Sequence, residues 1–225
     1  GASRVYITAR SEEKLLTKAK ELSEIAKGEC IPITGDLSSI EGVEALAGNL
    51  REKEKYIDVL INNAGIGTGG PFSELKPETW DITMDLNVKS PVFLTQKLRD
   101  LLGINATATD PSRVIFIASV AASYSIEGVL AYSTSKNAVE HVVPTLALAL
   151  CEENILVNAV SPGRFFSEMT RGAWQDSEAE SVLSAVEEGA AQEAEQQQTA
   201  DEALSAAAKW RNMLHFKLSQ KIHIE

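Results

Sequence analysis

Two side chains that could do acid–base chemistry stand four residues apart in the stretch AYSTSKNAVEHV, residues 131 to 142: Tyr132 and Lys136. On a helix, four residues turn through about 400°, so both side chains point the same way, one turn apart. A protonated lysine beside a phenol stabilises the phenolate, which suits the phenol to giving or taking a proton. The spacing is equally typical of an ordinary helix pair, since it arises by chance in roughly every second chain of this length. The interpretation therefore depends on the residues around the pair.

The elements that would position this pair follow a regular alternation. Nearly continuous apolar runs, typical of strands covered on both faces, lie at 4–8, 29–34, 57–61, 113–118 and 155–160. Between them, helical patterns are expected at about 11–27, 39–54, 78–102 and 131–152. Ser38 with Glu41 is a capping-box pattern, and Pro77 suits the first position of a helix. The alternation predicts an α/β fold, a doubly wound parallel sheet with helices on both faces.

The residues that directly follow the expected strands should gather, because such sheets bind ligands at the carboxyl ends of their strands. They are Ala9-Arg10, Gly35-Asp36-Leu37, Asn62-Asn63-Ala64-Gly65, Ser119-Val120 and Ser161-Pro162-Gly163. A lone serine after a strand usually serves the turn itself. Ser119, however, comes thirteen residues before Tyr132, so its hydroxyl could meet the phenol across the cleft.

Together these residues resemble the short-chain dehydrogenase/reductase family. Its markers appear in order over roughly residues 3 to 171: Asp36-Leu37, Asn62-Asn63-Ala64-Gly65, Asn87 in MDLNVKS, Ser119, Tyr132, Lys136 and Ser161-Pro162-Gly163, then Phe165 and Ser167 where the family tends to have an aliphatic residue and a threonine. The resemblance implies a Rossmann-like fold and an oxidoreductase that reduces a carbonyl or oxidises a secondary alcohol. The stretches PGRFFSEMTRG and DLSSIEG are most similar to reductases of the 3-oxoacyl-carrier-protein and rhamnolipid-pathway types.

The resemblance also implies a role for each matched residue. Tyr132 would be the general acid/base, and Lys136 would assist its ionisation and hold the nicotinamide ribose. Ser119 would bond the substrate oxygen, and Asn87 would position a water that links Lys136 to solvent. Without the other markers, Asn87 is better explained as a helix-interior amide that bonds a neighbouring backbone. The implied cofactor contacts are Arg10, Asp36, Leu37, Asn63, Ala64, Gly65, Tyr132, Lys136, Pro162, Gly163 and Ser167.

The choice of cofactor is indicated at the end of the first apolar run. An acid there would bond the ribose hydroxyls of NAD, but the sequence has Ala9 followed by Arg10. Because a guanidinium suits a 2′-phosphate, the sequence predicts NADP(H); the alternative is an exposed arginine that opens a helix. Asp36-Leu37 would flank the adenine, and the small Asn63-Ala64-Gly65 turn lets the backbone approach the cofactor.

Two parts of the family pattern are missing from the sequence. The family opens with a strand, a T-G-x-x-x-G-x-G turn that binds pyrophosphate and a helix, whereas this sequence starts at what resembles the second strand. No D-G-G follows Gly163, and residues 175 to 208 hold nine acids and no Lys or Arg. The sequence therefore predicts a truncated domain without its first β-α unit over 1–171, and an acidic tail, helical or disordered, over 172–225.

Two other functions are compatible with these residues. The chain could be a catalytically inactive fragment that at most self-associates through its long helices. It could also be an epimerase or dehydratase that uses the same tyrosine and lysine, although Asn-Asn-Ala-Gly and Asn-Val favour the reductase branch.

Composition bears on partners and location. The net charge is -11, and removing the nine acids of 175–208 leaves -2 for the rest, so no basic face indicates nucleic-acid binding. No apolar run of about 20 residues and no leader pattern is present, which predicts neither a membrane span nor secretion. Cys30 and Cys151 are expected to be free buried thiols of a cytoplasmic protein, and no histidine cluster indicates a metal. The expected partners are a small carbonyl or alcohol substrate and, from the resemblance, further copies in a homodimer or homotetramer.

Overall fold

The computed structural model describes residues 2 to 163. Contacts divide the chain into the units Gly1–Arg164 and Phe165–Glu225, and the description that follows concerns the first. Ser167, the acidic tail and the expected boundary between 171 and 172 lie outside the described residues.

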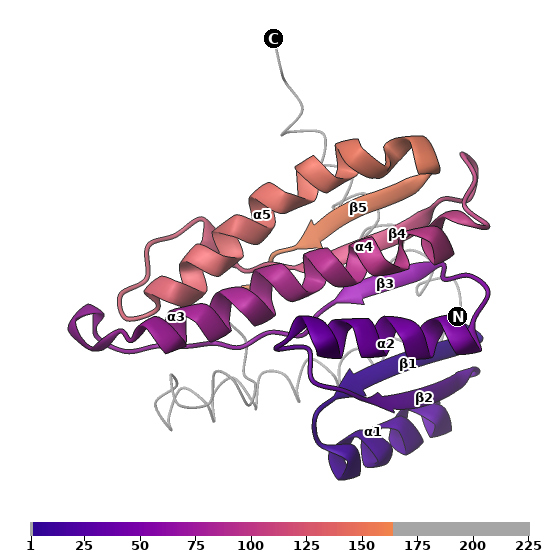
Figure 1. The fold of residues 1–225 in the computed structure, drawn as a ribbon, viewed down its shortest axis with the longest axis horizontal. Helices are drawn as coiled ribbons and strands as arrows, with labels where there is room; N and C mark the ends of the chain where they lie inside the picture. Colours follow the sequence, from indigo (N-terminus) through magenta and orange to yellow (C-terminus); the bar gives the residue numbers. More distant parts are fainter. Residues whose placement is uncertain (1, 164–225) are drawn as a thin grey trace, which may run out of the picture. The chain divides into compact units, whose positions relative to one another are not determined.

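Five strands form two parallel sheets (Figure 1). In one sheet β1 (Arg4–Ala9) pairs with β2 (Glu29–Thr34). In the other, the order is β3 (Val59–Asn62), β4 (Ser112–Ile117) and β5 (Ile155–Val160). The sequence predicted these strands, and the structure confirms their existence and their parallel direction.

The helices also follow the sequence pattern. They are α1 (Glu12–Ile25), α2 (Ile40–Lys53), α3 (Pro77–Met84), α4 (Ser90–Gly103) and α5 (Leu130–Leu150). Short turns of helix are η1 (Phe72–Glu74), η3 (Val120–Ala122) and η4 (Cys151–Glu153). Pro77 begins α3 as expected. The cap of α2 is Ser39 and not Ser38: the Ser39 hydroxyl accepts from the Gly42 N–H, while the Ser38 N–H donates to Asp36.

The segment expected as one helix at 78–102 is interrupted by a π-helical turn, η2 (Asp85–Lys89). Pro91 explains the interruption. Proline has no N–H to give to the Asn87 carbonyl four residues earlier, and its ring crowds that carbonyl. The helix instead forms a hydrogen bond across five residues, in which the Ser90 N–H donates to the Asp85 carbonyl. Such π turns are frequent at functional sites.

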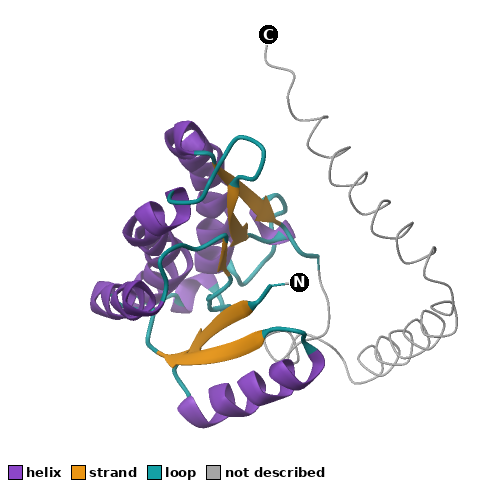
Figure 2. Ribbon diagram, turned by 90° about the vertical axis from the view of Figure 1, so that its right-hand side faces the viewer, coloured by secondary structure: helices purple, strands orange, loops and turns teal. Residues whose placement is uncertain are grey.

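Helices pack against both parallel sheets, which confirms the predicted α/β fold class (Figure 2). Helix α1 packs on β1 and β2, whereas α4 and α5 pack on the sheet of β3 to β5, and α2 packs on α4. The core lies between these helices and the strands; its most buried large side chains include Phe116, Leu98, Leu102, Val43 and Ile155.

Two expectations about burial are wrong. Strands β1 and β3 are not covered on both faces, since Val5 is 44% exposed and Ile61 57% exposed, whereas Val114 in β4 is fully buried. Exposed and buried residues alternate along β3, because within residues 2 to 163 the helices α4 and α5 pack on one face of its sheet. Of the two free thiols, Cys30 is buried but Cys151, in the short turn η4 after α5, is exposed.

Residues 2 to 163 contain no helix with both the length and the apolar character needed to cross a membrane. Nor do three or more His, Cys, Asp or Glu side chains gather there as a possible metal site.

Candidate active site

The expected catalytic pair lies in the first two turns of α5. Lys136 is only 7% exposed, and its Nζ stands 5.7 Å from the centroid of the Tyr132 ring. The same Nζ donates to the Ile117 carbonyl at the end of β4, at 2.7 Å. Burial lowers the pKa of Lys136, because a charged ammonium loses its hydration there. A buried amine is thus held beside the phenol by a carbonyl oxygen.

Asn87 connects this helix to the loop that follows β3. Its Oδ1 accepts from the Ile66 N–H at 2.8 Å, and its Nδ2 donates to the Ile66 carbonyl at 3.0 Å. The Nδ2 also donates to Ser135 Oγ at 2.9 Å, and Ser135 in turn donates to the Tyr132 carbonyl at 2.7 Å. Asn87 is therefore a clamp between the loop after β3 and the turn of α5 that carries the tyrosine. Its expected contact with a water stays a prediction.

Ser135 is a residue that the sequence analysis missed. It is fully buried and carries the contact between Asn87 and Tyr132. Its position three residues after Tyr132 places it near the same helix face, which is a signal that could have found it.

Gly65 shows how close the loop after β3 comes to this group. A Cβ at Gly65 would stand 3.1 Å from Asn87 Oδ1 and 3.7 Å from Lys136 Nζ. The other expected residues of the loop, Asn63 and Ala64, are exposed. A small residue is required here for packing against the asparagine, and the turn remains open to a ligand.

The ends of β4 and β5 complete this part of the site. Ser119 caps η3, and its hydroxyl accepts from the Ala121 N–H at 3.2 Å, which is the turn chemistry usual after a strand. The Val120 N–H donates to the Pro162 carbonyl at 3.1 Å, so the strand ends that carry Ser119 and Pro162 are side by side. Gly163, next in the chain, is exposed.

The residues expected near the adenine and its ribose lie at the ends of β1 and β2. The Gly35 N–H donates to the Ala9 carbonyl at 3.1 Å, which joins the two strand ends. The Ser38 backbone N–H and side chain hold the pKa of Asp36 below its usual value, and the charge of Arg10 acts in the same direction. Arg10 is exposed, whereas Leu37 packs into the core.

Comparison with known proteins decides the family. The model of the family described as short chain dehydrogenase matches residues 1–178. The chain belongs to this family. The resemblance seen in the sequence is therefore confirmed.

Similar proteins include several reductases. The chain is 40% identical to the rhamnolipids biosynthesis 3-oxoacyl-[acyl-carrier-protein] reductase of Pseudomonas aeruginosa, over 79% of this chain and 69% of that protein. A putative ketoacyl reductase of Streptomyces coelicolor is 36% identical over 71% of this chain and 60% of its own length. The chain thus spans 69% of the length of the first relative and 60% of the second.

Solved structures of the family share its fold. The Pseudomonas aeruginosa RhlG/NADP active-site complex matches with a TM-score of 0.72 at 40% identity, covering 75% of this chain and 66% of that one. A 3-oxoacyl-[acyl-carrier protein] reductase from Brucella melitensis in complex with NAD matches with a TM-score of 0.68 at 31% identity, covering 76% and 67%.

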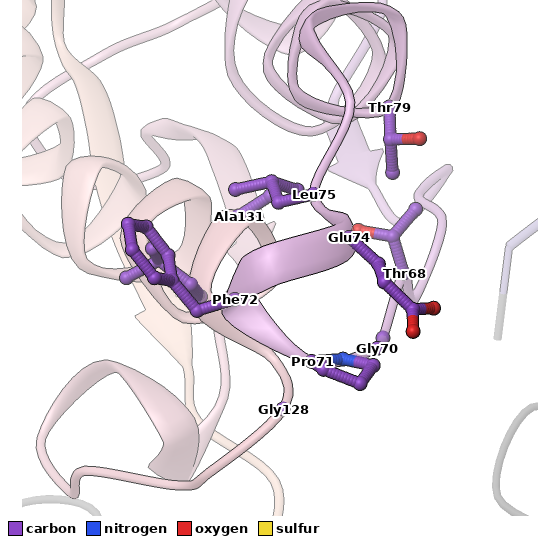
Figure 3. A pocket seen from close by; sticks show the side chains of 11 residues that line it. Thr68, Gly70, Pro71, Phe72, Glu74, Leu75, Thr79, Gly128 and Ala131 are labelled. Atoms are coloured by element: carbon purple, nitrogen blue, oxygen red, sulfur yellow. The ribbon is translucent and has the colours of Figure 1, made fainter.

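The loop of residues 68–75 lies against the start of α5. A small cavity of about 60 Å³ is lined by Thr68, Leu75, Leu130 and Ala131, among others (Figure 3). Beside it the Gly70 N–H donates to the Gly128 carbonyl at 2.7 Å, and both glycines have positive φ (147° and 78°), a conformation that favours glycine. This hydrogen bond between Gly70 and Gly128 holds the loop that leads into Ala131 and Tyr132.

The close approach at Gly65 makes a testable prediction. Gly65→Ala places a Cβ against buried Asn87 Oδ1 and should lower the free energy of unfolding by about 1–3 kcal/mol. Gly48→Ala is the matched control, because Gly48 lies inside α2 with nothing within 4 Å of an added Cβ. It should raise stability by about 0.5–1 kcal/mol. Urea unfolding of both variants measures the difference, and equal effects would show that the loop adapts to a larger residue.

Proposed function

We propose that this chain carries the catalytic centre of an NADP(H)-dependent oxidoreductase that reduces a carbonyl or oxidises a secondary alcohol. The observation that carries the proposal is the position of Lys136, buried and 5.7 Å from the centre of the Tyr132 ring. Membership of the short-chain dehydrogenase family supports it. So does the NADP complex of the structural relative that is 40% identical.

The side chains of this site suit proton transfer to a substrate oxygen. Tyr132 is the general acid in reduction and the general base in oxidation, and its hydroxyl exchanges a proton with that oxygen. Ser119, at the end of β4, is the second donor to the oxygen and stabilises the charge that develops there. Lys136 lies beside the Tyr132 ring, and its fixed contact with the Ile117 carbonyl keeps its amine in place.

The residues at the two sets of strand ends fit a nicotinamide dinucleotide phosphate. When bound, this cofactor supplies or takes the hydride. Arg10 would hold the 2′-phosphate, Asp36 and Leu37 the adenine, and Lys136 with Tyr132 the nicotinamide ribose. Asn63, Ala64, Gly65, Pro162, Gly163 and Ser167 would complete the contacts. Gly65 has no side chain and lies next to Lys136, which would let the cofactor approach the backbone closely at this point.

The substrate class that we propose is a 3-oxoacyl thioester. The support is the printed function of the relative that is 40% identical, a 3-oxoacyl-[acyl-carrier-protein] reductase, and of the ketoacyl reductase that is 36% identical. An acetoacetyl thioester is the shortest probe of this class. The reaction is tested by mixing the chain with NADPH and this thioester and measuring the loss of NADPH absorbance as the cofactor is oxidised.

The alternative, an inactive chain that at most self-associates, is tested by the same experiment. Saturable NADPH binding with turnover of the thioester supports the oxidoreductase. A folded chain with neither binding nor turnover on any ketone would overturn the proposal for this chain and favour the alternative. Self-association through α4 and α5 and a cytoplasmic location stay predictions; the exposed side chains of Phe93 and Leu148 on these helices support the first.

Cofactor selectivity gives a further prediction. Ala9→Asp combined with Arg10→Asn places an acid where the ribose hydroxyls of NAD would lie and removes the cation that suits a 2′-phosphate. We expect the ratio of NADPH to NADH affinity to fall by about tenfold or more, since one charge-assisted contact is worth about 1.5–3 kcal/mol. Fluorescence titrations with both dinucleotides measure the ratio. Arg113→Asn is the control, because Arg113 lies at the amino end of β4, away from the carboxyl ends that carry the site. An unchanged affinity ratio in the double variant would show that Arg10 does not contact the cofactor.

A further inference from the structure

The buried hydroxyl of Ser135 contacts two parts of the candidate site. Ser135 lies on α5 between Tyr132 and Lys136, and it is fully buried. Its Oγ accepts from Asn87 Nδ2 at 2.9 Å and donates to the Tyr132 carbonyl at 2.7 Å. A hydroxyl inside a helix that bonds only the helix backbone tends to bend the helix and to destabilise it slightly. The bond to Asn87 is therefore the contact through which this hydroxyl can serve the site.

The single hydrogen of this hydroxyl decides the direction of its bond to Asn87. Because that hydrogen is given to the Tyr132 carbonyl, Ser135 Oγ can only accept from the amide, and so it suits Nδ2 and not Oδ1. From the other side, the Ile66 N–H donates to Oδ1 at 2.8 Å, and the Ile66 carbonyl accepts from Nδ2 at 3.0 Å. Both neighbours thus require the same orientation of the Asn87 amide.

This orientation places the amide oxygen on the side of the buried amine. The two Nδ2 hydrogens of Asn87 go to Ile66 and Ser135. Oδ1 accepts from the Ile66 N–H and has a second lone pair. Oδ1 lies 3.1 Å, and Lys136 Nζ 3.7 Å, from the point where a Cβ of Gly65 would stand. The negative end of the amide dipole and the amine therefore border the same small space.

The bond to Ser135 is what ties this amide to the catalytic helix. Asn87 belongs to the π turn η2, and Ile66 belongs to the loop after β3. Within the described residues, the side chain of Asn87 has three hydrogen bonds, of which two go to Ile66 and one goes to α5. Without the hydroxyl of Ser135, the amide would be held by the loop alone.

We propose that Ser135 is a positioning residue of the proposed reaction, whose hydroxyl fixes the Asn87 amide to the turn of α5 that carries Tyr132 and keeps the amide oxygen beside Lys136. The inference rests on the proposed function, because it names a residue that keeps the catalytic side chains in place. In the described part of the chain, Ser135 bonds neither the phenol nor the amine. It acts through Asn87.

Removal of the hydroxyl leaves one Nδ2 hydrogen of Asn87 without its acceptor. Because a buried N–H without a partner is unfavourable, the amide has to turn or move to find another acceptor. Such a movement weakens the bond between Oδ1 and the Ile66 N–H and takes the oxygen away from Lys136. Ser135→Ala should therefore change both the protection of the Ile66 amide and the rate of the reaction.

The first measurement is hydrogen exchange at Ile66, which needs no cofactor. In Ser135→Ala this amide should exchange up to about tenfold faster than in the parent, the value of one hydrogen bond. Ser112→Ala is the matched control, because Ser112 is 5% exposed and its hydroxyl donates to the Leu102 carbonyl at 2.6 Å, at the amino end of β4. It loses a similar buried hydroxyl and should leave exchange at Ile66 unchanged. Urea unfolding of both variants shows whether a difference at Ile66 is local.

The second measurement is turnover of the acetoacetyl thioester with NADPH. Ser135→Ala should lower kcat by about tenfold and change the KM for the thioester by less than about twofold, because its hydroxyl acts on the groups that transfer the proton. Ser112→Ala should retain the parent kcat. In an Asn87→Ala background, Ser135→Ala should have no further effect on kcat, since the amide through which it acts is gone.

Several results would overturn the inference. Parent-like exchange at Ile66 in Ser135→Ala is one, and parent-like kcat in the same variant is another. Equal losses of kcat in Ser135→Ala and Ser112→Ala would assign the effect to stability alone. Additive losses in the Asn87→Ala background would mean that Ser135 acts through the Tyr132 carbonyl.

Failure of the proposed function gives a different result. A folded parent without turnover overturns the proposed reaction and, with it, any role of Ser135 in that reaction. Exchange at Ile66 is measured without substrate or cofactor, so it still decides whether Ser135 holds the Asn87 amide.

Discussion

Tyr132→Phe is expected to lower the turnover of an acetoacetyl thioester by about 10²–10⁴-fold, the usual range for loss of a general acid. The ring is half-buried at the start of α5, so phenylalanine fills the same space. Lys136 keeps its contact with the Ile117 carbonyl, because that hydrogen bond does not involve the phenol. The variant therefore removes one hydroxyl from a site that is otherwise intact.

The measurements that isolate this effect are kcat, KM and the Kd for NADPH. We expect the loss to fall on kcat, with cofactor affinity changed by less than about tenfold, the value of one hydrogen bond. Tyr124→Phe is the matched control, because Tyr124 is 70% exposed on the loop after Ser119 and should retain parent turnover. If Tyr132→Phe retained the turnover of the parent as well, the assignment of the general acid would be wrong.

Much of this fold follows from local sequence signals. The apolar runs predicted each strand because apolar residues at alternate positions pack into the core, as Val114 and Phe116 do in β4. The pair Tyr132 and Lys136 was predictable because helical geometry alone places them one turn apart. The family resemblance then supplied the roles of residues whose contacts depend on distant parts of the chain.

The remaining features depend on contacts that no local pattern contains. Asn87 bonds Ile66 and Ser135, which are 21 and 48 residues away in the sequence. Ser39, and not Ser38, caps α2, because the Ser38 N–H donates to the Asp36 carboxylate and so holds Ser38 in the turn before the helix. The exposure of Val5 is decided by what packs against β1 and not by the strand's own sequence.

The burial of Lys136 has a consequence for stability that depends on pH. Burial disfavours the ammonium, so the pKa of Lys136 in the folded chain lies below the ordinary lysine value of 10.5. Between these two values the unfolded chain binds more protons than the folded chain. The free energy of unfolding contributed by this group therefore rises with pH across that window, and the full cost of the buried charge is present below it.

Lys136→Met should remove this pH dependence and also impair the reaction. Methionine is similar in length and uncharged, and it cannot donate to the Ile117 carbonyl or place a charge beside the Tyr132 ring. We expect kcat to fall by about 10²–10³-fold, the usual cost of losing a preorganised electrostatic contact in an active site. Lys97→Met is the control, because Lys97 pairs with Glu44 on the surface, away from the strand ends.

Urea unfolding of the parent and of Lys136→Met at several alkaline pH values tests whether burial lowers the pKa of Lys136 in the folded chain. The parent should gain stability relative to the variant as pH rises toward 10.5, because only the parent loses the cost of a buried ammonium. A constant difference across this range would mean that Lys136 keeps its ordinary protonation in the folded chain. In that case the amine would be hydrated, and its effect on Tyr132 would be screened by water instead of acting through a buried contact.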